Sequence, residues 1–231
     1  MCGRYTVTQP KRIVRDLHGE GGPIDWSQRF NVAPGHVAPV VMSDKLNPPG
    51  LLAMSWGFAG PRKGLRARSL SQIINVRVET AHQKLRFREA FHLRRCVVLA
   101  DGFYEWRRMQ GQKQPYLFRL ENRMPFGFAG IWECTDKVGR GGVPSFAILT
   151  TVANQLVGEL HERMPVILDE RKREDWLDYD ASDDVLRGML EPFPDAAMER
   201  IPVSHYVNNP NNEGSGCIER IAEPEVDTLF S

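Results

Sequence analysis

The chain has 231 residues, enough for one sizeable hydrophobic core or two small ones. Its 42% hydrophobic and 26% charged residues are ordinary for a globular protein. No apolar run approaches the roughly 18 residues of a membrane helix, the N-terminus lacks a signal-peptide pattern, and the cysteines at positions 2, 96, 134 and 217 have no metal-ligand spacing. We therefore expect a cytoplasmic protein with reduced thiols and no membrane association.

The net charge of +1 averages two unlike regions of the chain. Between residues 62 and 95, ten Lys and Arg residues accompany two Glu residues, whereas from residue 169 onward sixteen acidic residues accompany six basic ones. Such asymmetry is typical of a protein with a polyanion-binding face, although a solvated charged surface explains any single run. The density of arginine favours phosphate as the ligand, because the planar guanidinium matches phosphate oxygens.

The first residues, Met1-Cys2-Gly3, carry the most specific chemistry. The Cys2 side chain is small enough for an aminopeptidase to remove Met1, which would leave an α-amine (pKa about 8) beside a thiol (pKa about 8.5). This aminothiol could attack an acyl carbon as an N-terminal nucleophile, or its two groups could capture one aldehyde as a five-membered thiazolidine. The alternative is that Cys2 is a small buried hydrophobic residue.

Hydrophobic periodicity and turn residues predict an α+β fold, rich in strands, with a single domain over residues 1–231. Strands are expected at residues 37–42, 51–56, 73–80, 96–100, 116–120, 126–131 and 146–151, and helices at residues 11–17, 84–93, 153–160, 170–177 and 183–190. Turns are expected at residues 21–23, 47–50 and 110–112, and an exposed, mobile loop at residues 57–68.

Polar residues on the strand expected at residues 73–80 form one candidate site. Asn75, Arg77 and Glu79 would share one face of that strand, because side chains alternate between faces. The face is either a solvated sheet surface or the wall of a polar site.

Glu105 and His161 are candidate proton-transfer residues. Glu105 stands between Tyr104 and Trp106; burial with these rings would raise its pKa toward neutrality, whereas exposure would leave it without a role. His161 follows the helix expected at residues 153–160. It is a natural proton shuttle if it meets Cys2 and Glu105, and otherwise a structural hydrogen-bonding residue.

Seven separated motifs, in order along most of the chain, resemble the SRAP family of abasic-site processing proteins, which shield abasic sites in single-stranded DNA. The motifs are Met1-Cys2-Gly3-Arg4-Tyr5, Asn31-Val32-Ala33-Pro34, Trp56-Gly57, Asn75-Val76-Arg77-Val78-Glu79-Thr80, Asp101-Gly102-Phe103-Tyr104-Glu105-Trp106, His161-Glu162-Arg163-Met164-Pro165 and Val207-Asn208-Asn209. The resemblance implies the SRAP fold, with mixed and antiparallel, barrel-like sheets and flanking helices.

The resemblance also implies roles for individual residues. Cys2, exposed by removal of Met1 that the protein itself could catalyse, would form a thiazolidine with the C1′ aldehyde of a ring-opened abasic sugar. Asn75 would orient the sugar, Glu105 would assist ring opening and handle the amine proton, and His161 would protonate the departing hydroxyl or the imine. The residues expected to contact DNA, by motif match and charge, are Arg4, Arg77, Arg163 and Asn31.

No metal or cofactor is needed for this chemistry, because the substrate supplies the electrophile and the protein both nucleophiles. The expected partner is single-stranded DNA containing abasic sites, and the expected state is a monomer. An imine intermediate would also make β-elimination, a lyase reaction, chemically reachable.

One motif departs from the family pattern. The family usually continues Trp-Gly-Leu-hydrophobic-Pro-x-Trp, whereas Trp56-Gly57 is followed here by Phe58-Ala59-Gly60-Pro61-Arg62, without the second aromatic residue. The residues that stack on DNA are therefore not identified by the motif.

Two other functions remain open. A glutamine amidotransferase-like N-terminal-nucleophile hydrolase would also begin Met-Cys-Gly, but its second domain and glutamine-recognition motifs are not found in the sequence. In a non-covalent single-stranded DNA-binding module, Cys2 would be incidental.

Overall fold

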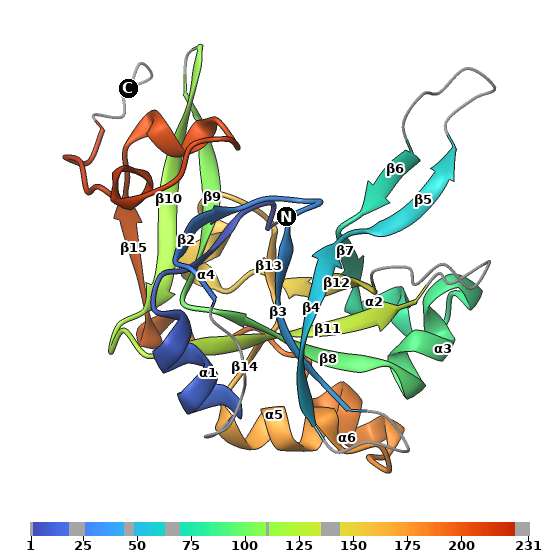
Figure 1. Ribbon diagram of the computed structural model, residues 1–231. Coiled ribbons are helices and arrows are strands. Elements are labelled where there is room, and N and C mark those ends of the chain that lie inside the picture. The colour runs from blue at the N-terminus through green and yellow to red at the C-terminus, as the bar shows by residue number, and fades with distance from the viewer. Residues whose placement is uncertain are drawn as a thin grey trace.

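The computed structural model describes residues 2–18, 26–43, 49–62, 70–109, 111–134 and 144–224. These residues form an α+β fold in which two sheets pack together and helices cover the outside (Figure 1). The predicted fold class is therefore confirmed. Within the described part of the chain, no helix has the length and apolar character to cross a bilayer.

The first sheet is antiparallel, with the strand order β15-β10-β9-β1-β2. Its strands are β1 (Tyr5–Val7), β2 (Arg29–Val32), β9 (Gly102–Met109), β10 (Gln112–Leu120) and β15 (Met198–Pro202). The short N-terminal strand thus occupies an interior position, where Tyr5 pairs with Phe103 on one side and Val32 on the other. Both edges of β1 are hydrogen-bonded, which fixes the start of the chain in the sheet.

The second sheet is mixed and closes on itself. Its path β13-β12-β4-β3-β8-β11-β14 returns from β11 to β12, and β7 adds to β12 in parallel. The strands are β3 (Val37–Met42), β4 (Gly50–Trp56), β7 (Asn75–Arg77), β8 (Arg95–Ala100), β11 (Phe126–Glu133), β12 (Ser145–Val152), β13 (Arg163–Pro165) and β14 (Ile167–Leu168). The expected barrel-like arrangement is this ring of β12, β4, β3, β8 and β11.

Helices lie around the closed sheet. They are α1 (Pro10–His18), α2 (Val78–Ala81), α3 (Leu85–Leu93), α4 (Gln155–Gly158), α5 (Glu170–Leu177) and α6 (Asp183–Gly188), with 3-10 turns η1 (Asp195–Ala197), η2 (His205–Asn208) and η3 (Ser215–Cys217). Side chains cap the beginnings of three helices: Asn154 accepts from Val157 N–H, Asp169 from Lys172 N–H, and Ser182 from Val185 N–H.

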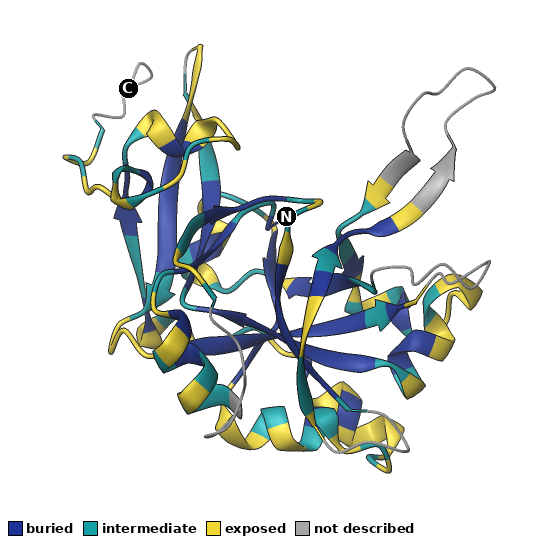
Figure 2. Ribbon diagram, in the orientation of Figure 1, coloured by how far each residue is buried: buried dark blue, intermediate teal, exposed yellow. Residues whose placement is uncertain are grey.

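Aromatic side chains join the two sheets. Tyr5 of β1 meets Trp56 of β4 and Phe128 of β11 edge-on, with ring centroids 5.2 and 5.8 Å apart. All three are fully buried. Figure 2 shows in dark blue that the strands at the centre of the molecule are largely buried. The residues that precede Tyr5 are therefore held against the interface between the sheets.

Two hairpins project from the same side of the molecule, and the N-terminal end lies between them in Figure 1. One is formed by β9 and β10, where Met109 pairs with Gln112 and Gly111 has a φ of 77°. The expected turn at residues 110–112 is consistent with this pairing, although residue 110 lies outside the described part. The other is formed by β5 (Phe58–Arg62) and β6 (Leu70–Ile73).

This second hairpin corrects the prediction of an exposed loop at residues 57–68. Gly57, with a φ of 121°, turns the chain out of β4, and Phe58 is then buried against Phe87 at 6.5 Å between ring centroids. Residues 63–69 lie outside the described part, as do the turn expected at residues 21–23 and residues 47–48 of the next expected turn.

A second correction concerns the strand expected at residues 73–80. The strand β7 ends at Arg77, and Glu79 belongs to the helix α2. Glu79 therefore does not share a face with Asn75. Its carboxylate instead pairs with Arg163, and it stands in the first turn of a helix, where a negative charge is favourable.

The close approach of β8 and β11 generates a stability prediction. A Cβ atom added to the buried Gly127 of β11 would lie 2.2 Å from Cγ1 of Val97 on β8. Because Gly127 pairs with strands on both sides, its backbone has little room to shift. We expect Gly127→Ala to reduce the free energy of unfolding by about 1–3 kcal/mol, measured by urea denaturation.

Gly188→Ala is the matched control, because a Cβ at this helical residue meets no atom within 4 Å. Equal denaturation midpoints for the two variants would contradict the predicted overpacking at Gly127.

Candidate active site at the N-terminal strand

Hydrogen bonds on Asp101 hold the N-terminal strand in place. The Asp101 carboxylate accepts from the hydroxyls of Thr6 (2.5 Å) and Thr8 (2.6 Å) and from the backbone N–H of Thr8 (2.7 Å). Three residues before β1, Cys2 is fully buried, and its Sγ lies 3.6 Å from the carbonyl oxygen of Arg4. Burial raises the pKa of the Cys2 thiol, as does the Glu105 carboxylate, so the sulfur is protonated at neutral pH.

Asn75 connects Cys2 to the second sheet. It begins β7, which pairs in parallel with β12, and its Nδ2 donates a 2.8 Å hydrogen bond to the Cys2 carbonyl oxygen. Its Oδ1 is buried and has no hydrogen-bond partner among the described residues. Asn75 therefore presents an acceptor with unused capacity next to Cys2.

Glu105 is a buried carboxylic acid in the middle of β9, with 4% of its surface exposed. Burial raises the pKa of the Glu105 carboxyl, and the positive charge of the chain's N-terminal amine opposes part of this shift. The same carboxylate contributes to the raised pKa of Cys2, which places the two groups within electrostatic reach of each other. Glu105 can therefore hold a proton and exchange it with groups on the first residues.

His161 enters the site from the turn between α4 and β13. Its Nδ1 accepts a 2.9 Å hydrogen bond from the backbone N–H of Arg163, so the neutral ring carries its proton on Nε2. Burial lowers the pKa of His161, which favours the neutral ring at physiological pH. In this state Nε2 is a hydrogen-bond donor.

A cleft of about 850 Å³ lies beside these groups, and Glu105 and His161 both line it. Gly3 and Arg4 from the N-terminal segment and Trp106 from β9 line it as well. The structure thus brings Cys2, Asn75 and Glu105 together and directs His161 to the same cleft. The arrangement offers one buried thiol, two groups that can exchange protons and an amide acceptor.

The DNA-contacting residues expected from the sequence occupy very different environments. The side chain of Arg77 is 59% exposed and lies 3.9 Å from Glu162, so it can reach a ligand. Arg4 lines the cleft, but its guanidinium donates to Asn31 Oδ1 (2.8 Å) and to the Val207 carbonyl (2.9 Å).

The other two residues expected to contact DNA are buried in this structure and bond within the protein. Asn31 is fully buried and donates to the carbonyls of Asn209 (3.0 Å) and Asn212 (2.9 Å), so it holds the loop after η2. Arg163 is 6% exposed and forms a bidentate pair with Glu79. Both side chains satisfy buried polar groups within the protein.

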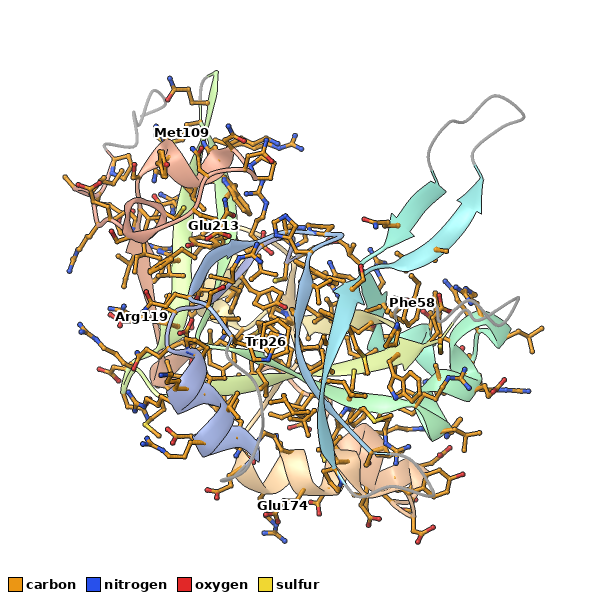
Figure 3. The ribbon with its side chains drawn as sticks, viewed as in Figure 1. Trp26, Phe58, Met109, Arg119, Glu174 and Glu213 are labelled. Atoms are coloured by element: carbon orange, nitrogen blue, oxygen red, sulfur yellow. The ribbon has the colours of Figure 1, made fainter. Side chains whose placement is uncertain are left out.

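The projecting β9–β10 hairpin contributes cleft residues that the motifs did not single out. Arg108 of β9 and Lys113 of β10 line the cleft and add positive charge to one wall. In Figure 3, Met109 marks the end of β9 in this hairpin. The sequence does contain a signal for this basic wall: two successive arginines, at positions 107 and 108, precede a predicted turn.

Trp106 forms part of the same wall. The Arg4 guanidinium lies 5.7 Å from the centre of its ring, and its Nε1 donates to Asn208 Oδ1 at 2.7 Å. A fixed indole at the edge of a basic cleft is a surface on which a base can stack. Among the described residues, no group of three or more His, Cys, Asp or Glu side chains could hold a metal ion.

The fold and the site define an α+β protein in which the segment after a buried Cys2 lines a basic cleft, together with the buried Glu105 and with His161. The model of the family described as SOS response associated peptidase (SRAP) matches residues 1–210, and the chain belongs to this family.

Sequence relatives agree with this assignment, and a solved structure shares the fold. The chain is 32% identical to the abasic site processing protein YoqW of Bacillus subtilis, over 95% of this chain and 99% of that protein. It is 28% identical to the abasic site processing protein YedK of Escherichia coli, over 96% and 100% of the two chains. A crystal structure of a Bacteroides thetaiotaomicron protein shares the fold, with a TM-score of 0.80, 22% identity, and coverage of 96% and 100%.

The buried carboxyl generates a prediction on stability. Since the pKa of Glu105 is raised in the folded state, folding takes up a proton at pH values between the unfolded and folded pKa. This group therefore makes the protein less stable as pH rises above about 4, the ordinary pKa of Glu. We expect Glu105→Gln to be more stable than the parent at pH 7, with the difference disappearing toward pH 4.

Denaturation midpoints at several pH values measure this difference. Glu199→Gln, at a partly exposed carboxylate paired with Arg119, serves as the control. A Glu105→Gln variant that is less stable than the parent at pH 7 would show that the carboxylate is stabilising in its site.

Proposed function

We propose that this protein captures abasic sites in single-stranded DNA as a covalent thiazolidine on Cys2, after Met1 has been removed. The observation that carries the proposal is the Asn75–Cys2 hydrogen bond, which fixes the N-terminal residue beside the buried Glu105. The names of the relatives, abasic site processing proteins, support the same class of substrate.

The proposed reaction needs both nucleophiles of Cys2. The α-amine adds to the C1′ aldehyde of the ring-opened sugar, and the carbinolamine loses water to form an imine. The thiol then adds across the C=N bond: sulfur bonds to C1′ and the thiol proton ends on nitrogen. One water molecule is released overall, and no oxidant or reductant is consumed.

Glu105 and His161 have complementary parts in this sequence. Glu105 accepts a proton from the amine as it attacks, because burial raises its pKa and so makes the carboxylate a stronger base than an exposed Glu. The neutral His161 ring carries its proton on Nε2, because Nδ1 accepts a hydrogen bond, so its Nε2–H acts as the donor toward the departing hydroxyl. The proton that Glu105 took from the amine passes to this hydroxyl, which leaves as water. The free Oδ1 of Asn75 accepts from a sugar hydroxyl or from the amine.

The decisive experiment incubates Met-free protein with a single-stranded oligonucleotide that contains one abasic site. We expect a heat-stable adduct with the mass of protein plus DNA minus one water, and no adduct with undamaged DNA. Cys2→Ala keeps the α-amine but loses the thiol, so it should yield DNA-linked protein only after borohydride reduction of the imine. Cys134→Ala, at an exposed cysteine, is the matched control and should react like the parent.

Other outcomes would replace the proposal. Ammonia release from glutamine would indicate an amidotransferase-like hydrolase, and salt-sensitive binding without adduct would indicate a non-covalent module.

Within the proposed mechanism, Glu105→Gln should slow adduct formation by about 10²-fold or more while binding to undamaged DNA stays unchanged.

The exposed cations generate a separate prediction on non-covalent binding. Arg77 is exposed to solvent and Arg108 lines the cleft. Each should therefore displace counterions from the DNA when it contacts a phosphate. We expect Arg77→Ala and Arg108→Ala each to reduce the slope of log K against log salt by roughly 0.7. The control is Arg187→Ala, at a surface residue paired with Asp183 on α6. A slope equal to that of the parent would exclude the residue from the phosphate contacts.

A further inference from the structure

A half-buried ion pair joins the helix that follows Asn75 to the strand that follows His161. Nη1 and Nη2 of Arg163 lie 2.5 and 2.9 Å from the two carboxylate oxygens of Glu79, and Nη2 also donates to the carbonyl of Thr150. The Arg163 side chain is 8% exposed and that of Glu79 is 49% exposed. Hydrogen bonding to Arg163 lowers the pKa of Glu79, which keeps the carboxylate charged.

The pair bridges two strands that do not contact each other directly. The strand β12 lies between β7 and β13, and Thr150 of β12 pairs with Arg77 of β7 and with Pro165 of β13. Glu79 follows β7, which begins with Asn75, and Arg163 begins β13, immediately after the His161 turn. The ion pair therefore fixes the His161 turn relative to the strand that carries Asn75.

Arg163 also controls the imidazole through its backbone. The N–H that donates to Nδ1 of His161 belongs to the residue whose side chain is locked by Glu79. Without this donor, nothing in the contacts of His161 with described residues would keep Nδ1 unprotonated. The orientation of this peptide thus selects the tautomer that places a proton on Nε2.

We propose that Glu79 is a positioning residue, which acts through Arg163 to hold His161 as the Nε2-protonated tautomer facing the cleft. The proposal rests on the proposed function for its catalytic consequence, since His161 is the proton donor there. It assigns the bidentate ion pair to orientation of the site, and it removes Arg163 from the residues available to DNA phosphate in this state.

Removing Glu79 leaves a buried guanidinium without its counter-charge, which is unfavourable enough to displace the side chain. Arg163 then moves toward solvent and takes its backbone N–H with it. Glu79→Ala should displace Arg163 more than Glu79→Gln, because glutamine keeps one hydrogen-bond acceptor for the guanidinium. If Glu79→Ala does not fold, Glu79→Gln carries the test.

The nitrogen chemical shifts of the His161 ring, recorded on 15N-labelled full-length protein without DNA, report the tautomer directly. In the parent we expect an unprotonated Nδ1 and a protonated Nε2. In the Glu79 variants we expect the two shifts to move toward each other as both tautomers become populated. Adduct formation should slow between about tenfold and 10²-fold, with Glu79→Gln less affected than Glu79→Ala.

Glu159→Gln is the matched control. Glu159 lies two residues before His161 and pairs with Arg200, but its side chain is 50% exposed and, within the described part of the chain, forms no hydrogen bond or ion pair with His161 or Arg163. We expect its tautomer and its adduct rate to match the parent.

An unchanged His161 tautomer in both Glu79 variants would overturn the proposal, and so would a loss of affinity for undamaged DNA equal to the loss of adduct rate. The tautomer measurement does not depend on the proposed function. A parent protein that forms no adduct would refute that function, while the chemical shifts would still decide whether Glu79 orients His161.

Discussion

A single hydrogen bond, from the Asn75 amide to the Cys2 carbonyl, joins the start of the chain to the closed sheet. The position of the other site residues is useful for chemistry only if Cys2 is held in one place. Pairing of β1 on both edges and the bonds from Thr6 and Thr8 to Asp101 fix the strand, and the aromatic contacts of Tyr5 fix its depth. Asn75 then fixes the orientation of the peptide group between Cys2 and Gly3, because it donates a hydrogen bond to the carbonyl oxygen of that group.

Burial has opposite consequences for stability and for chemistry at this site. A neutral thiol and a carboxyl with a raised pKa are both kept away from water, which lowers the stability that an apolar core of the same size would provide. In return, burial raises the pKa of both groups, so each binds a proton more strongly than it would in water. Sites that carry such groups are commonly the least optimised parts of a fold for stability.

Two polar side chains, Asn31 and Arg4, hold the C-terminal loop that forms part of the cleft wall. Asn31 and Arg4 together satisfy four carbonyls of the C-terminal loop, and Glu213, labelled in Figure 3, binds Arg29 and the backbone N–H of Phe30. The loop that follows η2 therefore has fixed contacts with β2, although the two are about 180 residues apart along the chain. Motif residues in this region serve the architecture of the cleft.

The strands and long helices of this protein were predictable because their hydrophobic periods are regular. The strand at Val37–Met42 and the helix at Glu170–Leu177 have their predicted bounds. The hairpin at Phe58 was not predictable, since its pairing depends on a tertiary pocket formed with Phe87 and not on local alternation.

The candidate site residues could be selected from the sequence, but their environments could not. From the sequence, Arg163 in the motif that contains His161 is a reasonable candidate for a phosphate contact, because its carboxylate partner is not evident there. For Arg163 that partner, Glu79, lies 84 residues earlier in the chain. Likewise, nothing in the spacing of Asn31 distinguishes a DNA contact from a fully buried side chain.

The interior position of β1 has a consequence for the order of events during synthesis. Tyr5 pairs with Phe103, so the first strand has no partner on that side until the ribosome has made more than a hundred residues. At about 5–20 residues per second, this leaves the nascent N-terminus accessible for several seconds or longer. An aminopeptidase that acts on emerging chains would work within this interval, before the sheet closes over the second residue.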